Sequence, residues 1–338
     1  MSELQILEHA DVFKLEAGGH LDSLKIAYHT FGNRLPDDSN VVWVFHALTA
    51  NSNPLEWWPG MMGSGKFFDP EKYFIICANI PGSCYGSSGP EDINLASEKV
   101  WRNDFPLISI RDIVNVFEIL RKHLQLSRIH IAIGGSLGGY QALEWAIMKP
   151  GLIENLIPIA SGINASPWFK AINQSQRMAL EADESFIRGE EHGGKKGLAA
   201  ARAISMSFFR SYSAFGKTQK DSDDQIFEGF KASSYQKYQG EKLVKRFSPY
   251  AYYAITRLVD SHNLARGRGN AIVALQKITS KSLCIGIKND LLIPAEESKF
   301  LAENIPDGTY AEIETEWGHD GFLIETVKLS RILQDFLS

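Results

Sequence analysis

The chain of 338 residues is 44% hydrophobic and 22% charged, and its net charge at pH 7 is −5. These values are typical of a globular protein with a full-sized core, and the acidic balance provides no electrostatic surface for nucleic acid. Three cysteines (Cys77, Cys84 and Cys284) are too few for a disulfide framework, and neither a membrane-spanning apolar run nor a basic leader followed by an apolar stretch is evident. We therefore expect a cytoplasmic protein that binds neither nucleic acid nor membrane.

Strand patterns dominate the first third of the chain. Residues 13–16 and 24–31 alternate between apolar and polar side chains on either side of a Gly-Gly pair, which predicts an antiparallel hairpin at a sheet edge. Continuous apolar runs at 41–45 and 73–79 are typical of strands that are covered on both faces. Apolar residues at helical spacing predict a helix over 108–124.

A serine between two glycines marks the next strand-to-helix junction. The strand pattern from residue 129 runs into Gly134-Gly135-Ser136-Leu137-Gly138, and helical spacing covers 140–147. Gly-x-Ser-x-Gly in this context is the sharp turn that lifts a serine hydroxyl above a sheet, and the glycines avoid a clash at close backbone approach. The start of the helix favours negative charge beside the hydroxyl. An ordinary glycine-rich turn is the alternative, but we predict that Ser136 is a nucleophile.

The alternation of strands and helices predicts an α/β core with a mostly parallel sheet and helices on both of its faces. This core comprises residues 1–163 and 264–338 and includes further strands at 153–160, 282–287 and 310–313. Residues 164–263 are mostly helical and polar, which predicts a helical insertion that covers the core as a lid. Within this insertion, residues 190–196 are expected to form an exposed loop.

A nucleophilic serine needs a base, and the base needs an acid that orients it. After this kind of turn the acid and then the histidine follow along the chain. Asp290 comes just after the strand at 282–287, although a turn or N-cap aspartate is an alternative reading. His192 lies in a Gly/Lys-rich loop and His262 in the insertion, whereas His319 follows the last strand. We therefore predict Asp290 as the acid and His319 as the base.

An acyl-transfer intermediate also needs backbone donors for its oxyanion. We predict that the N–H groups of Leu137, directly after the nucleophile, and Leu48, after the first buried strand, serve this purpose. His46 is expected to be a structural residue of that loop. No histidine or cysteine spacing indicates a metal, and Gly63-Ser64-Gly65-Lys66 lacks the frame of a phosphate-binding loop, so no bound cofactor is expected.

Blocks along nearly the whole chain, from about residue 25 to residue 333, resemble the homoserine O-acetyltransferase family, the α/β-hydrolase-fold acyltransferases of methionine biosynthesis. The blocks lie at residues 27–32, 46–49, 63–69, 82–90, 104–106, 134–146, 197–202, 235–240 and 318–320. The sequence departs from the usual family pattern around Pro81, at Tyr140 (commonly Met) and at Ser248 (commonly Asp).

The resemblance implies an α/β-hydrolase fold and a catalytic triad of Ser136, Asp290 and His319. It also implies that Arg202 and Asp320 contact the substrate, which fits the carboxylate and ammonium of homoserine. Acetyl-CoA would be the co-substrate in a ping-pong mechanism, and the protein would be a homodimer built through the insertion. A serine esterase of the same fold, a binding protein that keeps the fold but has lost the chemistry, a succinyl-CoA donor and a serine acceptor are the alternatives.

Overall fold

The computed structural model describes residues 3–223 and 225–338 of the chain. Its main sheet has eight described strands in the order β1-β4-β6-β5-β9-β10-β11-β12. The β1–β4 and β4–β6 ladders are antiparallel and the others are parallel, so the predicted mostly parallel sheet is confirmed. The strands are β1 (Gln5–His9), β4 (Leu24–Phe31), β5 (Val41–Phe45), β6 (Phe74–Ala78), β9 (Ile129–Gly135), β10 (Ile153–Ile159), β11 (Lys281–Ile287) and β12 (Gly308–Ile313).

At one edge of the main sheet the strand pairing differs from the predicted hairpin. Strand β4 pairs with β1, whereas β2 (Phe13–Lys14) pairs with β3 (His20–Leu21) in a separate two-stranded ribbon. Phe13 and Leu21 are buried in the hydrophobic core. Alternation along a strand indicates that one face is buried but does not identify the strand beside it. The predicted pairing of 13–16 with 24–31 was therefore wrong.

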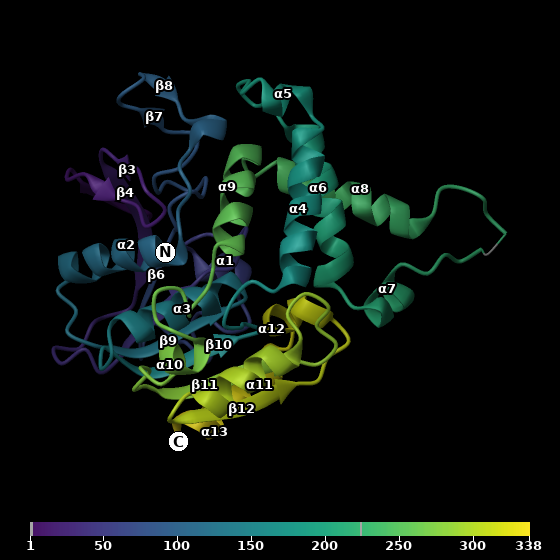
Figure 1. Ribbon diagram of the computed structural model, residues 1–338. Helices are drawn as coiled ribbons and strands as arrows, with labels where there is room; N and C mark the ends of the chain where they lie inside the picture. The colour runs from purple at the N-terminus through teal and green to yellow at the C-terminus, as the bar shows by residue number, and fades with distance from the viewer. Residues whose placement is uncertain (1–2, 224) are drawn as a thin grey trace.

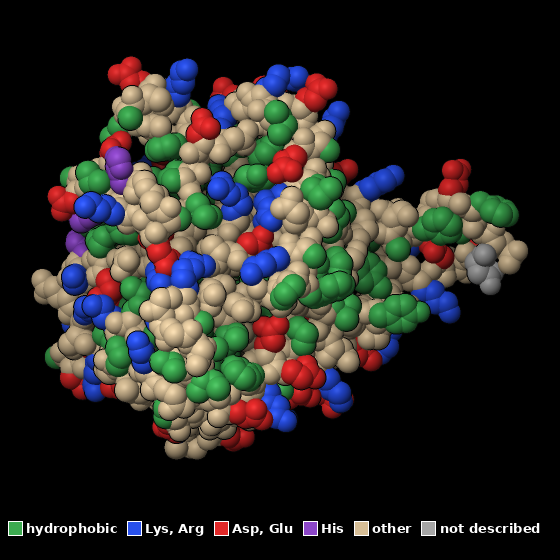
Figure 2. All heavy atoms as spheres, viewed as in Figure 1, with side chains coloured by type: hydrophobic (Ala, Val, Ile, Leu, Met, Phe, Trp, Pro, Cys, Tyr) green, Lys and Arg blue, Asp and Glu red, His purple; other side chains and the backbone are tan. Residues whose placement is uncertain are grey.

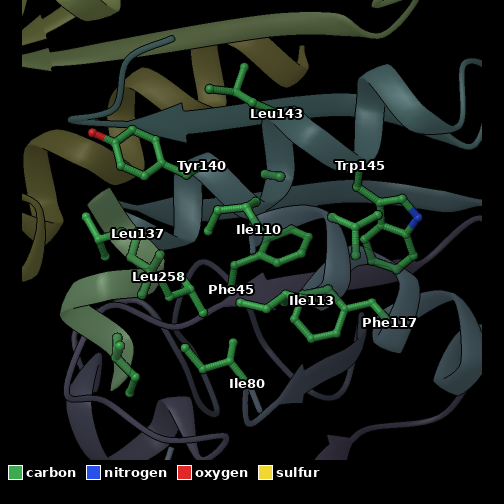
Figure 3. Packing of buried hydrophobic residues seen from close by; sticks show 14 of the residues in the cluster. Phe45, Ile80, Ile110, Ile113, Phe117, Leu137, Tyr140, Leu143, Trp145 and Leu258 are labelled. Carbon is green, nitrogen blue, oxygen red and sulfur yellow. The ribbon is translucent and has the colours of Figure 1, made fainter. Parts of the chain in front are cut away.

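Successive residues of β5 point to opposite faces of the sheet and enter two hydrophobic clusters. Trp43 and Phe45 pack with Phe117 and Trp145, and Figure 3 shows this face of the core. Val44 belongs to the cluster on the other face. The sheet is thus covered on both sides, as its continuous apolar strands require. The covering and connecting elements are α1 (Pro54–Trp57), η1 (Arg102–Asp104), α2 (Ile110–His123), α3 (Leu137–Met148), α10 (Ala271–Leu275), α11 (Ala295–Asn304), η2 (Gly318–Asp320), α12 (Gly321–Ile324) and α13 (Thr326–Leu337), with a small ribbon of β7 (Ile93–Asn94) and β8 (Lys99–Val100).

Residues 164–263 contain six helices in their described part, as their helical pattern predicted: α4 (Pro167–Glu181), α5 (Glu184–Ile187), α6 (Lys195–Phe209), α7 (Tyr212–Thr218), α8 (Lys231–Val244) and α9 (Pro249–Asp260). In Figure 1, α4, α5, α6 and α9 stand together above the core, and the segment between α7 and α8 projects away from the body; residues of α4 and α6 face the loops that follow β5 and β9 across a cavity. Ser166 and Ser248 cap α4 and α9, and a proline follows each cap. Serine at 248 therefore retains a capping function that aspartate would also supply.

One expectation for this region was wrong in part. Within residues 190–196, His192 is exposed, but Gly193 and Gly194 are buried against α5 and α9. A Cβ on Gly194 would lie 2.8 Å from Pro249 and 2.9 Å from the ring of Phe186. The two glycines allow the turn to pack closely against α5 and α9, so the turn is buried at these two positions.

No described helix combines the length and the apolar character needed to cross a membrane. Met1 and Ser2, which begin the stretch inspected for a leader, lie outside the described residues.

Candidate active site

Ser136 occupies a strained turn between β9 and α3. Its backbone has φ +56° and ψ −122°, a conformation that L residues adopt rarely. A Cβ on Gly134 would lie 2.6 Å from the carbonyl carbon of Gly138, and one on Gly138 would lie 2.3 Å from the carbonyl oxygen of Phe45. The hydroxyl of Ser161 donates to the Ser136 carbonyl at 2.9 Å. Glycine at two positions and this buried hydrogen bond therefore hold the serine in place.

Asp290 and His319 form a buried pair at the ends of β11 and β12. Nδ1 of His319 donates to Oδ2 of Asp290 at 2.6 Å, while Oδ1 of Asp290 accepts from the amides of Leu292 (2.8 Å) and Ile293 (3.0 Å). Burial by itself lowers the pKa of His319, but the adjacent Asp290 outweighs burial and the net pKa is raised. With its Nδ1 proton engaged, the imidazole can accept a proton at Nε2.

Ser136 and His319 line the same cavity of about 430 Å³. The Ser136 hydroxyl makes no hydrogen bond to His319 within the described residues. Catalytic hydrogen bonds are often long in the absence of substrate, so the shared cavity is the relevant observation.

The loop after β5 is fixed by His46. Its ring donates from Nδ1 to the Ala47 carbonyl (2.9 Å) and accepts at Nε2 from the Ile80 amide (3.2 Å). Burial lowers the pKa of His46 to about 4, so the ring is neutral, as this pattern requires. The amides of Leu48 and Leu137 donate no hydrogen bond within the described residues, and both residues line the cavity beside Ser136. Two free donors therefore lie near the predicted nucleophile.

Charged side chains of opposite sign line the same cavity. Arg202 extends from α6, and Asp320 follows His319 in η2. Within the described residues Arg202 forms no ion pair, and its guanidinium lies 5.3 Å from the ring centre of Phe209. Burial lowers the pKa of Arg202 and raises that of Asp320, although nearby arginines oppose the latter change. The cavity can thus receive a ligand that carries both a carboxylate and an ammonium group.

The structure also reveals polar residues that sequence reasoning missed. Arg210 pairs with Asp320, with Nε 3.0 Å from Oδ2. Behind the nucleophile turn, His262 is buried and stacks on Tyr140 with ring centres 4.1 Å apart. The Tyr140 hydroxyl and His262 Nε2 have no partner among the described residues, and burial lowers the pKa of His262 to about 3. The placement of His262 in the insertion gave no signal of this contact with the core.

No group of three or more His, Cys, Asp or Glu side chains that could hold a metal occurs in the part of the chain that the structure describes.

A strained serine between β9 and α3, a buried His–Asp pair after later strands and a mostly parallel sheet define the α/β-hydrolase class of fold. In agreement, a sequence profile described as the alpha/beta hydrolase fold matches residues 40–326.

Sequence relatives define the family more narrowly. Homoserine O-acetyltransferase of Cyclobacterium marinum is 44% identical over 326 residues, which cover 96% of this chain and 93% of that protein. The homoserine O-acetyltransferase of Chlorobaculum parvum is 41% identical, with 96% and 92% covered. The chain belongs to the homoserine O-acetyltransferase family.

Solved structures share the fold. Homoserine O-acetyltransferase from Staphylococcus aureus superposes with a TM-score of 0.83 at 27% identity, covering 100% of this chain and 96% of that one. Esterase E22 superposes with a TM-score of 0.91 at 22% identity, covering all of both chains. Since an esterase and an acetyltransferase share this architecture, the cavity's side chains must distinguish the two activities.

Proposed function

We propose that the protein transfers an acetyl group from acetyl-CoA to the side-chain hydroxyl of L-homoserine. One observation carries the proposal: Arg202 and Asp320 line the same cavity as Ser136 and His319. A carboxylate bound by the arginine and an ammonium bound by the aspartate would orient the acceptor's hydroxyl toward the acyl group. A plain esterase has no need of such a pair.

In the first half-reaction Ser136 attacks the thioester carbonyl of acetyl-CoA. His319, oriented by Asp290, accepts the hydroxyl proton at Nε2 as the Oγ–C bond forms. The amides of Leu48 and Leu137 donate to the oxyanion of the tetrahedral intermediate. As the intermediate collapses, the C–S bond breaks and His319 returns the proton to the thiolate, which leaves as CoA.

In the second half-reaction the homoserine hydroxyl attacks the acetyl-serine carbonyl. His319 again accepts the proton, and the same two amides hold the oxyanion. Collapse breaks the bond to Ser136 Oγ, which regains its proton, and O-acetyl-L-homoserine leaves. All of these steps use protein groups and the two substrates, so the mechanism needs no bound cofactor.

Residues 164–263 are proposed to act as a lid on the core formed by residues 1–163 and 264–338. Phe169, Asn173, Arg202, Phe209 and Arg246 of this segment line the cavity opposite the core's Ser136 and His319. A cover of this kind limits the access of water, which would otherwise hydrolyse the acyl-enzyme.

The same segment is proposed to form a homodimer. Phe227, in the projecting segment between α7 and α8, is 96% exposed, and Tyr212, at the start of α7, is 90% exposed. Figure 2 shows hydrophobic side chains gathered on this projection. Large apolar side chains on an extended arm are typical of a surface that a second copy covers.

We propose that the enzyme acts in the cytoplasm. Its cysteines at 77, 84 and 284 are free thiols, which suits a reducing compartment.

The proposed function is tested by measuring free CoA thiol after mixing the protein with acetyl-CoA or succinyl-CoA. Each donor is combined with L-homoserine, L-serine or no acceptor, and Ser136→Ala is the control. We expect turnover with acetyl-CoA that depends on homoserine and disappears in the variant. Turnover that needs Ser136 but no acceptor would instead identify a hydrolase.

A further inference from the structure

We propose that Arg210 is a positioning residue that orients Asp320 toward the amino group of the acceptor and thereby sets the enzyme's preference for amino-acid alcohols. This inference rests on the proposed function. In this role Arg210 does not contact the acceptor itself and acts on it only through Asp320.

The end of α6 is fastened to the loop that carries His319. Arg210 directly follows α6, and its guanidinium lies 5.1 Å from the ring centre of Trp317 while Nε pairs with Asp320. The next residue, Ser211, donates its hydroxyl to the Glu316 carbonyl. Gly318 lies so close that a Cβ there would be 2.8 Å from the Ser211 amide nitrogen. Arg210 is therefore held by contacts on both sides of the base.

The Asp320 carboxylate forms an ion pair but keeps its capacity to accept hydrogen bonds. Arg210 Nε lies 3.0 Å from Oδ2 without the angle of a hydrogen bond, and the carboxylate accepts no hydrogen bond from the Arg210 side chain. The Asp320 side chain is 19% exposed and lines the cavity, so its carboxylate can accept hydrogen bonds from an acceptor's ammonium group. The positive charge of Arg210 favours the orientation of Asp320 in which the carboxylate stays between Arg210 and the cavity.

Arg210 also maintains the charge that the ammonium group needs. Burial raises the pKa of Asp320, Asp290 adds to the rise, and Arg210, Arg202 and His319 oppose it. Removing Arg210 would therefore favour the protonated carboxyl, which attracts an ammonium group poorly.

Arg202 and Asp320, which are proposed to bind the carboxylate and the ammonium group of the acceptor, do not pair with each other. Asp320 pairs with Arg210 and not with Arg202, so Arg202 has no ion-pair partner among the described residues. Phe209, the residue before Arg210, lies beneath the Arg202 guanidinium at 5.3 Å and faces the His319 ring at 5.9 Å. Phe209 thus contacts Arg202 and His319, and the next residue, Arg210, pairs with Asp320.

The test compares two acceptors that differ in the amino group: L-homoserine and 4-hydroxybutanoate. Each is measured as an acceptor and as a competing inhibitor, with wild-type protein, Arg210→Met and Arg210→Lys. For Arg210→Met we expect kcat/KM for L-homoserine to fall about 10- to 100-fold, the usual scale for a lost charge-assisted contact, and Arg210→Lys to recover part of it. Binding and turnover of 4-hydroxybutanoate should change by less than about threefold, so the preference between the two acceptors collapses.

The rate of the donor half-reaction distinguishes a specific role of Arg210 in positioning Asp320 from general structural support of the loop that carries His319. The rate of CoA release from acetyl-CoA in a single acylation should stay within about threefold of wild type in Arg210→Met. The matched control is Arg188→Met, since Arg188 is exposed and pairs with Glu184 and Glu190 outside the cavity. The control should leave both acceptor constants unchanged.

Equal losses for both acceptors, or a lost acylation step, would overturn the proposal. So would an unchanged preference in a folded Arg210→Met variant. A wild-type protein that releases CoA but does not acetylate homoserine would refute the proposed function itself, before any variant is compared.

Discussion

Replacing Asp290 with asparagine should disable the base while leaving the fold intact. The asparagine Oδ1 can still accept from the Leu292 and Ile293 amides, which lie 2.8 and 3.0 Å from the native oxygen. Its amide NH₂ would then stand where Oδ2 stands, 2.6 Å from Nδ1 of His319. Two donors cannot face each other at that distance, so Nδ1 must give up its proton and Nε2 must carry it. In that tautomer His319 cannot accept the proton of Ser136.

We expect a loss of about 10³- to 10⁴-fold in the acylation rate, corresponding to about 4–5.5 kcal/mol of transition-state stabilisation. The acid limb of the residual pH profile should move to lower pH. The proposed mechanism requires neutral His319, and the charge of Asp290 raises the pKa of that imidazole, so removal of the charge lowers the pKa.

Rapid-mixing measurements of CoA release from acetyl-CoA, between pH 5 and 9, provide the assay. Circular dichroism and thermal unfolding check that the variant is folded, and Asp335→Asn, at an exposed position on α13, is the matched control. A folded Asp290→Asn variant with less than about a tenfold loss would show that Asp290 does not set the tautomer of His319.

Three further predictions concern the turn, a buried carboxyl and the projecting segment. Gly138→Ala should lower the free energy of unfolding by about 1–3 kcal/mol in urea titrations, because its Cβ would lie 2.3 Å from the Phe45 carbonyl oxygen; an unchanged midpoint would contradict this. Burial and the nearby Asp290 raise the pKa of Glu297 to about 7, so its ionisation costs the folded state stability as pH rises from about 4.5 through 7. Glu297→Gln should therefore flatten the decline in melting temperature between pH 5 and 8, and an equal decline in both proteins would disprove the assignment. Phe227→Asp should convert a dimer to a monomer in sedimentation experiments, since that ring is 96% exposed in one chain; an unaltered dimer would place the interface elsewhere.

Local features of this protein could be predicted from the sequence. The turn at Ser136 requires glycine where two backbone segments are in close contact. These glycines, Gly134 and Gly138, lie two residues from Ser136 in the sequence and could therefore be recognised there. The buried strand β5 was recognisable because a strand covered on both faces is apolar throughout. The proximity of Asp290 and His319 could be predicted because the carboxyl ends of neighbouring parallel strands meet at one edge.

Contacts between distant segments could not be predicted in this way. The partner of β4 depends on packing that alternation does not encode, so the pairing of β4 with β1 was missed. Arg210 reads as an ordinary cation at the end of a helix, and its partner Asp320 lies far along the chain. His262 stacks on Tyr140 where the chain returns from the insertion to the core, and no local sequence pattern predicts this contact.

In the proposed mechanism Ser136 carries the acetyl group between the two substrates. The most direct test mixes the protein with acetyl-CoA alone, quenches it in acid, identifies the modified peptide by mass spectrometry, and repeats the quench after adding L-homoserine. We expect an acetyl ester on Ser136 that forms with CoA release and disappears as O-acetyl-L-homoserine appears. Formation of O-acetyl-L-homoserine at an undiminished rate by Ser136→Ala, with no acetylated peptide, would contradict it.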